Sequence, residues 1–259
     1  MAQRFPLVVA CFVALCAPAA AQTEDGLGTG PRVSSRGERL AVGTHPDAAF
    51  QLTLRAEAQR LAKAKTPGVS LWTQIAKAAV DRYASRRDLT VQRRFDSVLR
   101  DTTAVLVGET TMRKHIKQLR EYDANRFLSL PGARNPQVTW LLKELDSMPD
   151  VYAGDDLDKT RCSDFRPAFR DGSMNQVFHT YFYVAMAYFT GDHYAVTLGN
   201  LHHEVFDPHG SWADYDVGNW AAHLGVNVRK LRDAGKLQAL YAFPALIGAT
   251  FGTNAVSYG

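Results

Sequence analysis

The chain has 259 residues, of which 46% are hydrophobic and 22% charged, and its formal net charge is +4 at pH 7. These values are ordinary for a folded globular protein and exclude disordered, collagen-like and disulfide-dense small proteins. The chain contains no block of Lys and Arg, so we expect no specific nucleic-acid recognition. The mild positive charge suits an anionic substrate, small or polymeric, without identifying one.

Residues 1–21 have the features of a secretory signal peptide. Arg4 supplies the positive charge, Leu7–Leu15 is an apolar run, and Ala19–Ala21 offers small residues for cleavage before Gln22. The apolar run is shorter than the roughly 20 residues that span a bilayer. We therefore expect an exported protein, periplasmic or extracellular, with no membrane span in the mature chain.

Removal of the signal peptide would leave Cys162 as the cysteine of the mature chain, because Cys11 and Cys16 lie within the signal. An exported protein with one cysteine forms no internal disulfide, so we expect apolar burial to provide its stability. We interpret Cys162 as a spare thiol in a loop, with a nucleophilic role as the alternative.

The segment 22–46 is rich in Gly, Thr, Ser and Arg, and we expect a flexible lead-in there. From residue 47 to residue 259 we expect a single helical domain, because apolar residues recur at intervals of three and four. Thr103–Val107 is the one short β-branched run, and Ser70 is a candidate cap of the second helix. The predicted helices of this half cover 47–65, 70–83, 88–100, 111–126 and 138–148, and the segment 149–173 is predicted to be an irregular connection.

The segment of about 174–189 is apolar on nearly every side, which predicts a helix buried at the centre of the fold. A helix over 192–206 follows, and Ser211 is predicted to cap another, with Asp214 as an acidic capping-box residue. The apolar segment Leu237–Phe251 predicts a terminal helix that is kinked or ended at its proline. The fold class is therefore predicted to be all-α, a multi-helix bundle with little or no sheet.

Two polar rows on these last helices could carry chemistry. Asn200 and Glu204 share a stripe opposite the apolar one, and its lack of Lys and Arg argues against a stripe that faces water. Asp216, Asn219 and His223 share a face that borders the apolar stripe of the next helix, where a cleft-lining residue would project. Glycines 218 and 225 lie on a third side, where they would allow close approach of another helix.

We predict that three consecutive helices bring these groups into one cluster, as helix bundles do when they bind metals. The predicted ligands of zinc or another divalent metal are His179, His203, Glu204, Asp216 and His223. The predicted catalytic residues are Glu204 as general base, His179, His203 and Asp216, with Asn175, Asn200 and Asn219 orienting the ligands.

The function predicted from this cluster is a metal-dependent hydrolase that acts on an anionic or cell-envelope substrate. One alternative is a non-catalytic secreted helical module, in which the buried polar residues only fix helix packing. A second alternative is an effector or toxin domain that targets the envelope of a competitor.

A series of polar residues within about 171–228 carries a resemblance to a known group. The series consists of Asn175, His179, His203, Glu204, Asp216, Asn219 and Gly225. It resembles the signature of a group of uncharacterised bacterial helical domains, which have an Asn or Asp shortly before a His, then His-Glu, then Asp, Asn and Gly. Phe178 and Trp220 depart from that signature, since the group usually has Arg and a second Asn there. The resemblance implies a helical domain and no particular activity.

Overall fold

The computed structural model describes residues 48–114, 116–117, 136–146, 152–153, 162–172, 176–205 and 211–253. The predicted signal peptide and lead-in lie outside the described residues, as does most of the helix predicted over 111–126. The described helices all belong to one compact unit, His45–Gly259.

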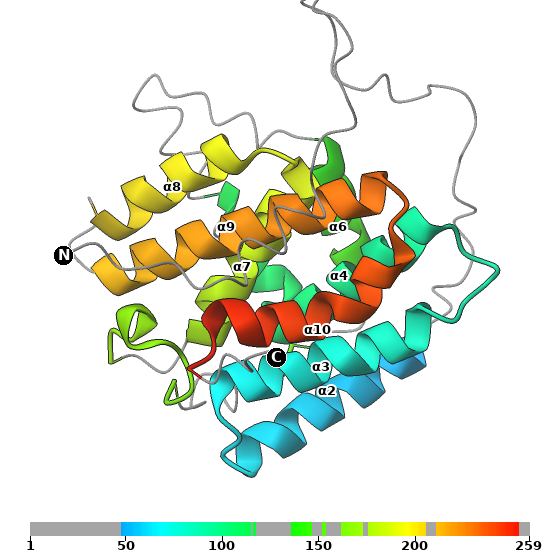
Figure 1. Ribbon diagram of the computed structural model, residues 1–259, viewed down its shortest axis with the longest axis horizontal. Helices are drawn as coiled ribbons and strands as arrows, with labels where there is room; N and C mark the ends of the chain where they lie inside the picture. The colour runs from blue at the N-terminus through cyan, green and yellow to red at the C-terminus, as the bar shows by residue number, and fades with distance from the viewer. Residues whose placement is uncertain are drawn as a thin grey trace, which may run out of the picture. The chain divides into compact units, whose positions relative to one another are not determined.

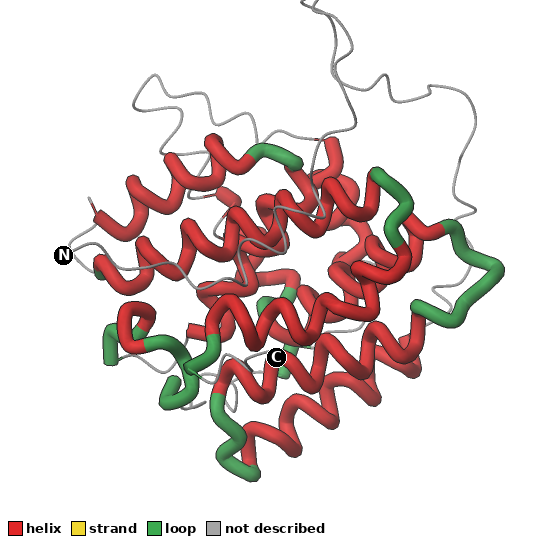
Figure 2. Tube along the Cα trace, viewed as in Figure 1, coloured by secondary structure: helices red, strands yellow, loops and turns green. Residues whose placement is uncertain are grey.

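The described part of the chain is an all-α bundle, which confirms the predicted fold class. Figure 2 shows helices joined by loops, with no strand in the described ranges, and the one β contact given for them is an isolated bridge between Phe165 and Gly252. No helix among the described residues is both long and apolar enough to cross a membrane. The elements are α2 (Ala48–Lys63), α3 (Gly68–Tyr83), α4 (Val91–Leu106), α6 (Pro136–Asp146), η3 (Pro167–Phe169), α7 (Gln176–Thr190), α8 (His193–Val205), α9 (Trp212–Asp233) and α10 (Leu237–Phe251).

Helix α7 is the central helix of the bundle. It contacts α3, α4, α6, α8 and α9, and every residue from Thr180 to Phe189 is buried. This confirms the buried helix that its apolar sequence predicts, because a helix that is hydrophobic all round must be covered all round. In Figure 1, helices α8, α9, α10, α3 and α2 lie in this order, and each contacts the next.

The two glycines of α9 allow the close helix contacts that the sequence predicts. A Cβ atom on Gly225 would lie 2.4 Å from the carbonyl oxygen of Val184 and 2.9 Å from the amide nitrogen of Tyr188, so the α9 and α7 backbones touch there. A Cβ atom on Gly218 would lie 2.5 Å from Oδ1 of Asn200, on α8. Alanine at Gly225 would force the two backbones apart, whereas alanine at Gly218 would displace the Asn200 amide.

The structure decides three local features of the helices, and one prediction among them was wrong. The β-branched run Thr103–Val107 lies mostly within a helix, because α4 continues to Leu106 and the Thr103 hydroxyl donates to the Leu99 carbonyl. Of the two outcomes predicted at Pro244, the helix does not end there, since it runs through the proline to Phe251. Ser70 does not cap α3, since the helix already begins at Gly68, and its cap comes from a distant segment.

That distant segment is the loop around Asp164. The Asp164 carboxylate accepts hydrogen bonds from the backbone N–H groups of Val69 (3.0 Å) and Ser70 (2.8 Å), in the first turn of α3. Such a side chain satisfies donors that a helix start leaves without partners. The same loop holds the end of α10, because the Arg166 amide donates to the Phe251 carbonyl at 2.8 Å.

Candidate metal centre

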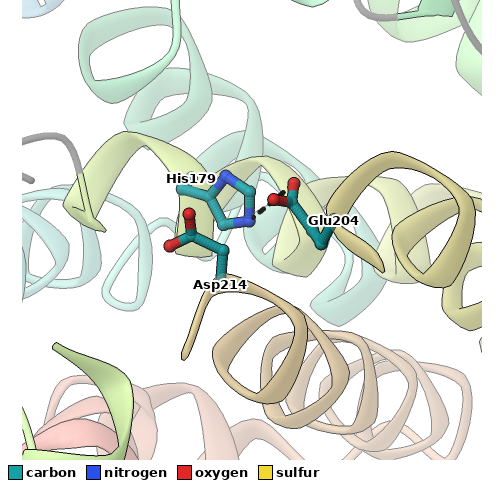
Figure 3. Close-up of side chains that lie close together, drawn as sticks. All are labelled: His179, Glu204 and Asp214. Carbon is teal, nitrogen blue, oxygen red and sulfur yellow. Dashed lines mark ion pairs between the residues drawn. The ribbon is translucent and has the colours of Figure 1, made fainter. Parts of the chain in front are cut away.

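Three helix ends bring His179, Glu204 and Asp214 together. His179 lies one turn into α7, Glu204 lies in the last turn of α8, and Asp214 lies in the first turn of α9. One potential ligand atom from each residue lies within 4.8 Å of the others. Figure 3 shows the imidazole between the two carboxylates, with Glu204 on one side and Asp214 on the other. Three such side chains are the number that catalytic zinc sites commonly use.

The contact between His179 and Glu204 is buried. Nε2 of His179 lies 3.3 Å from Oε1 of Glu204, and the two side chains are 13% and 4% exposed. The imidazole and the ring of Tyr183, one turn further along α7, pack edge to face, with 5.1 Å between ring centroids. Burial, and then the charges of Glu204 and Asp214, raise the pKa of the Tyr183 hydroxyl.

Asp214 is held in place through both its backbone and its carboxylate. Its amide donates to the Ser211 hydroxyl at 3.0 Å, which confirms the predicted cap of α9. Its carboxylate accepts a 2.5 Å hydrogen bond from the side-chain amide of Gln176, the first residue of α7. The same Gln176 nitrogen donates to Asp171 at 3.1 Å, so a third carboxylate lies beside the group.

The surroundings of Asp214 shift its pKa upward. Burial raises the pKa of Asp214 to about 6, and the charge of Asp171 and a hydrogen bond with that side chain act in the same direction. Hydrogen bonds from Gln176 and Ser211 partly offset this rise. The Asp214 carboxylate therefore loses its proton less readily than an ordinary aspartate.

The structure brings together only part of the predicted cluster. His179 and Glu204 meet, whereas Asp216 is exposed and lies outside the group. His223 is also exposed and stacks against His193, with 3.7 Å between ring centroids. The side chain of His203 and the whole of Asn175 lie outside the described residues.

Two of the predicted orienting residues, Asn200 and Asn219, connect α8 to α9 through hydrogen bonds. Asn200 is fully buried, which agrees with the prediction that its stripe does not face water. Its Nδ2 donates to the Tyr215 carbonyl at 2.7 Å and to Oδ1 of Asn219 at 3.1 Å. These contacts fix α8 against α9 close to the ends that carry Glu204 and Asp214.

The sequence analysis did not assign Asp214, Asp171 or Gln176 to the site. The capping-box spacing predicted only a structural role for Asp214. The structure shows that Asp214 has this role and also lies beside His179 and Glu204. The spacing could have indicated the position of Asp214. It lies on the same helix face as Gly218, Ala221 and Gly225, at intervals of three and four residues. Small residues on that row mark the side on which neighbouring helices come close.

Cys162 lies near the same end of α7 and is partly buried. Burial is the main cause that raises the pKa of its thiol, and the nearby carboxylates of Asp171, Asp164 and Asp214 act in the same direction. A thiol with a raised pKa is a poor nucleophile and a poor metal ligand near neutral pH. Its burial and raised pKa therefore favour the interpretation of Cys162 as a spare thiol.

Comparisons of the chain with protein-family models, with curated proteins and with solved structures found no match.

Proposed function

We propose that the protein binds a divalent cation through His179, Glu204 and Asp214 and acts as a metal-dependent hydrolase. The observation that carries the proposal is that three different helices place these ligand atoms within 4.8 Å of one another. His203, whose side chain lies outside the described residues, stays a predicted further ligand.

The chemistry of the site divides between the cation and the side chains. A divalent cation supplies a Lewis acid that polarises a carbonyl or phosphoryl oxygen and activates water. Gln176 holds the Asp214 carboxylate through the 2.5 Å hydrogen bond. Glu204 is largely buried and lies 3.3 Å from His179. If it does not bind the cation, its carboxylate is the candidate general base.

The substrate class is proposed from charge alone. A net charge of +4 is compatible with an anionic substrate, including phosphate-bearing and cell-envelope compounds. Export to the periplasm or the medium stays a prediction, because residues 1–21 lie outside the described part.

Metal analysis of the purified protein tests the proposal directly. We expect one divalent ion per chain, and we expect that His179→Ala, Glu204→Gln and Asp214→Asn each remove it. Asp216→Asn and His223→Ala are matched controls, because each removes the same kind of side chain from outside the group. Wild-type protein that binds no divalent ion, or controls that lose it equally, would contradict the proposal.

A second candidate function is a non-catalytic helical module. It is favoured by the contacts of Asn200 with Tyr215 and Asn219, which join α8 to α9 without any catalytic geometry. In that case His179 and Glu204 would only hold α7 against α8. The metal analysis separates the two candidates, because a packing network needs no ion.

A further inference from the structure

The described side chains hold α8 to the bundle at its start, its middle and its end. His193, the first residue of α8, stacks on His223 of α9. Asn200, near the middle, is hydrogen-bonded to α9, and Glu204, in the last turn, lies beside His179. Helix α8 packs mainly against α9, and Figure 1 shows it at one edge of the described helices. The histidine stack is therefore a contact that keeps the start of α8 in place.

The two imidazole rings of the stack lie close enough that two positive charges would repel each other. Their centroids are 3.7 Å apart, and their planes are tilted by 34°. Two neutral rings attract each other at this separation, and a proton on one ring leaves a cation on a neutral π system, which is also attractive. A proton on both rings places two like charges face to face, and this contact is unfavourable.

The surroundings of the stack favour the neutral form of both rings. Burial is the main cause that lowers the pKa of each ring, and the charge of Lys230, two turns after His223 on α9, acts in the same direction. Asp192, just before α8, opposes the shift at His193. Among the described residues, the other elements packed against α9, which are α4, α7, α10 and η3, add no charged group to those that act on the stack.

We propose that the stack of His193 on His223 is a pH-sensitive contact, and that protonation of both rings at about pH 5 shifts α8 toward a state separated from α9. The rest of the bundle stays folded, because its helices are held without α8. The backbones of α7 and α9 touch at Gly225, and α10 packs against both α3 and α9.

The separation of α8 has a consequence for the candidate metal centre. Glu204 ends the same helix, so a state in which α8 leaves α9 also removes this carboxylate from His179. Acid would then disable the centre without unfolding the protein. This consequence rests on the proposed function, whereas the pH-sensitive contact itself requires no metal.

The experiment is amide hydrogen exchange of the full chain in metal-free buffer at pH 8 and pH 5, followed by mass spectrometry. The rates are corrected for the intrinsic effect of pH on exchange, so that they report helix opening. We expect the amides of 197–205 to lose protection at least about tenfold at pH 5, because the separated state binds both protons. The amides of α3 and α10 should change less than about twofold.

Two kinds of variant test whether the stack causes this change. His193→Gln/His223→Gln keeps polar side chains that do not titrate, and it should reduce the change in α8 to less than about threefold. Each single variant should give nearly the same result, because one charged ring then has no charged partner to repel. Neither position is buried, so the replacements are compatible with folding.

A loss of protection that is confined to α8 in wild type and absent from the variants supports the inference. Unchanged protection of α8 at pH 5 overturns it, as does an equal loss in α3 and α10, which would mean global unfolding. A single variant that responds as wild type does also overturns it, because one imidazole would then suffice without the stack. The exchange is measured without metal, so these outcomes are independent of the metal analysis that decides the proposed function.

Discussion

His179 and Glu204 meet at 3.3 Å in the interior of the bundle and join the second turn of α7 to the last turn of α8. Both side chains are largely removed from water, which makes the pair expensive to keep for stability alone. Well-packed apolar residues would hold the two helices together as firmly. Burial of this pair is therefore weak evidence for a role in stability.

The first prediction concerns the stability that this pair contributes. We expect His179→Leu alone to destabilise the fold by about 3 kcal/mol, because it leaves a buried carboxylate without its imidazole. We expect the double variant His179→Leu/Glu204→Met to recover most of that loss. Urea unfolding without divalent ions measures both. A double variant as unstable as the sum of its single variants would contradict the prediction, because additive losses mean that the two side chains are not coupled.

The second prediction concerns Asp214. Its partly buried carboxylate lies beside that of Asp171, so at pH 7.5 without metal we expect Asp214→Asn to be more stable than wild type. After allowance for screening by solvent, the gain is about 1 kcal/mol, or about 2–4 °C in Tm. With Mn²⁺ or Zn²⁺ present the order should reverse, because only wild type gains binding energy. Asp216→Asn should change neither melting curve, and an unchanged order with metal would refute the prediction.

The third prediction concerns the stacked histidines, His193 and His223. Burial lowers the pKa of both, the charge of Lys230 acts in the same direction on both, and His193 further lowers the pKa of His223. Asp192 opposes the shift at His193, and the Thr197 hydroxyl lies 3.2 Å from its ring. The folded state therefore binds protons less readily than the unfolded state does.

Because both pKa values are lower in the folded state, the two histidines contribute their full stability above the unfolded pKa of about 6.5. This contribution is lost as the pH falls through their pKa values in the folded state. We expect the free energy of unfolding to fall more between pH 8 and pH 5 in wild type than in His193→Gln/His223→Gln. Urea titrations at several pH values measure the difference. Parallel curves for the two proteins would contradict the prediction.

The fourth prediction compares two helical glycines. Gly225→Ala should destabilise the fold by about 1–3 kcal/mol, because the added methyl group meets the α7 backbone at Val184. Gly248→Ala should stabilise it by about 0.5–1 kcal/mol, since nothing lies within 4 Å of that position in α10. Thermal unfolding tests both. Equal effects at the two positions would show that the α7–α9 contact is looser than described.

The sequence predicted the fold class well because apolar spacing is a local property. The buried helix α7, the Ser211 cap and the close approach at Gly225 all follow from short stretches of residues. The start of α3 could not be predicted in this way, since its cap, Asp164, lies far along the chain.

The candidate site was predicted less completely, for a related reason. Helical spacing tells which residues share a face, but not which face a neighbouring helix covers. Asp216 and His223 share a face that the fold leaves exposed, whereas Asp214 lies on the row of small residues that packs inward. Asp171 could not be assigned, because only the fold brings this loop residue beside Gln176.

The packing of α10 against α3 also decides the order in which the chain can fold during synthesis. The ring of Trp72, in α3, is fully buried and lies 5.1 Å from that of Phe251, the last residue of α10. Almost the whole described chain separates the two, so the aromatic surface of Trp72 stays without this cover until residue 251 has left the ribosome. Contacts between such distant segments form slowly and leave apolar surface exposed in the meantime. This part of the core is therefore completed late, and the nascent chain depends on staying soluble until α10 arrives.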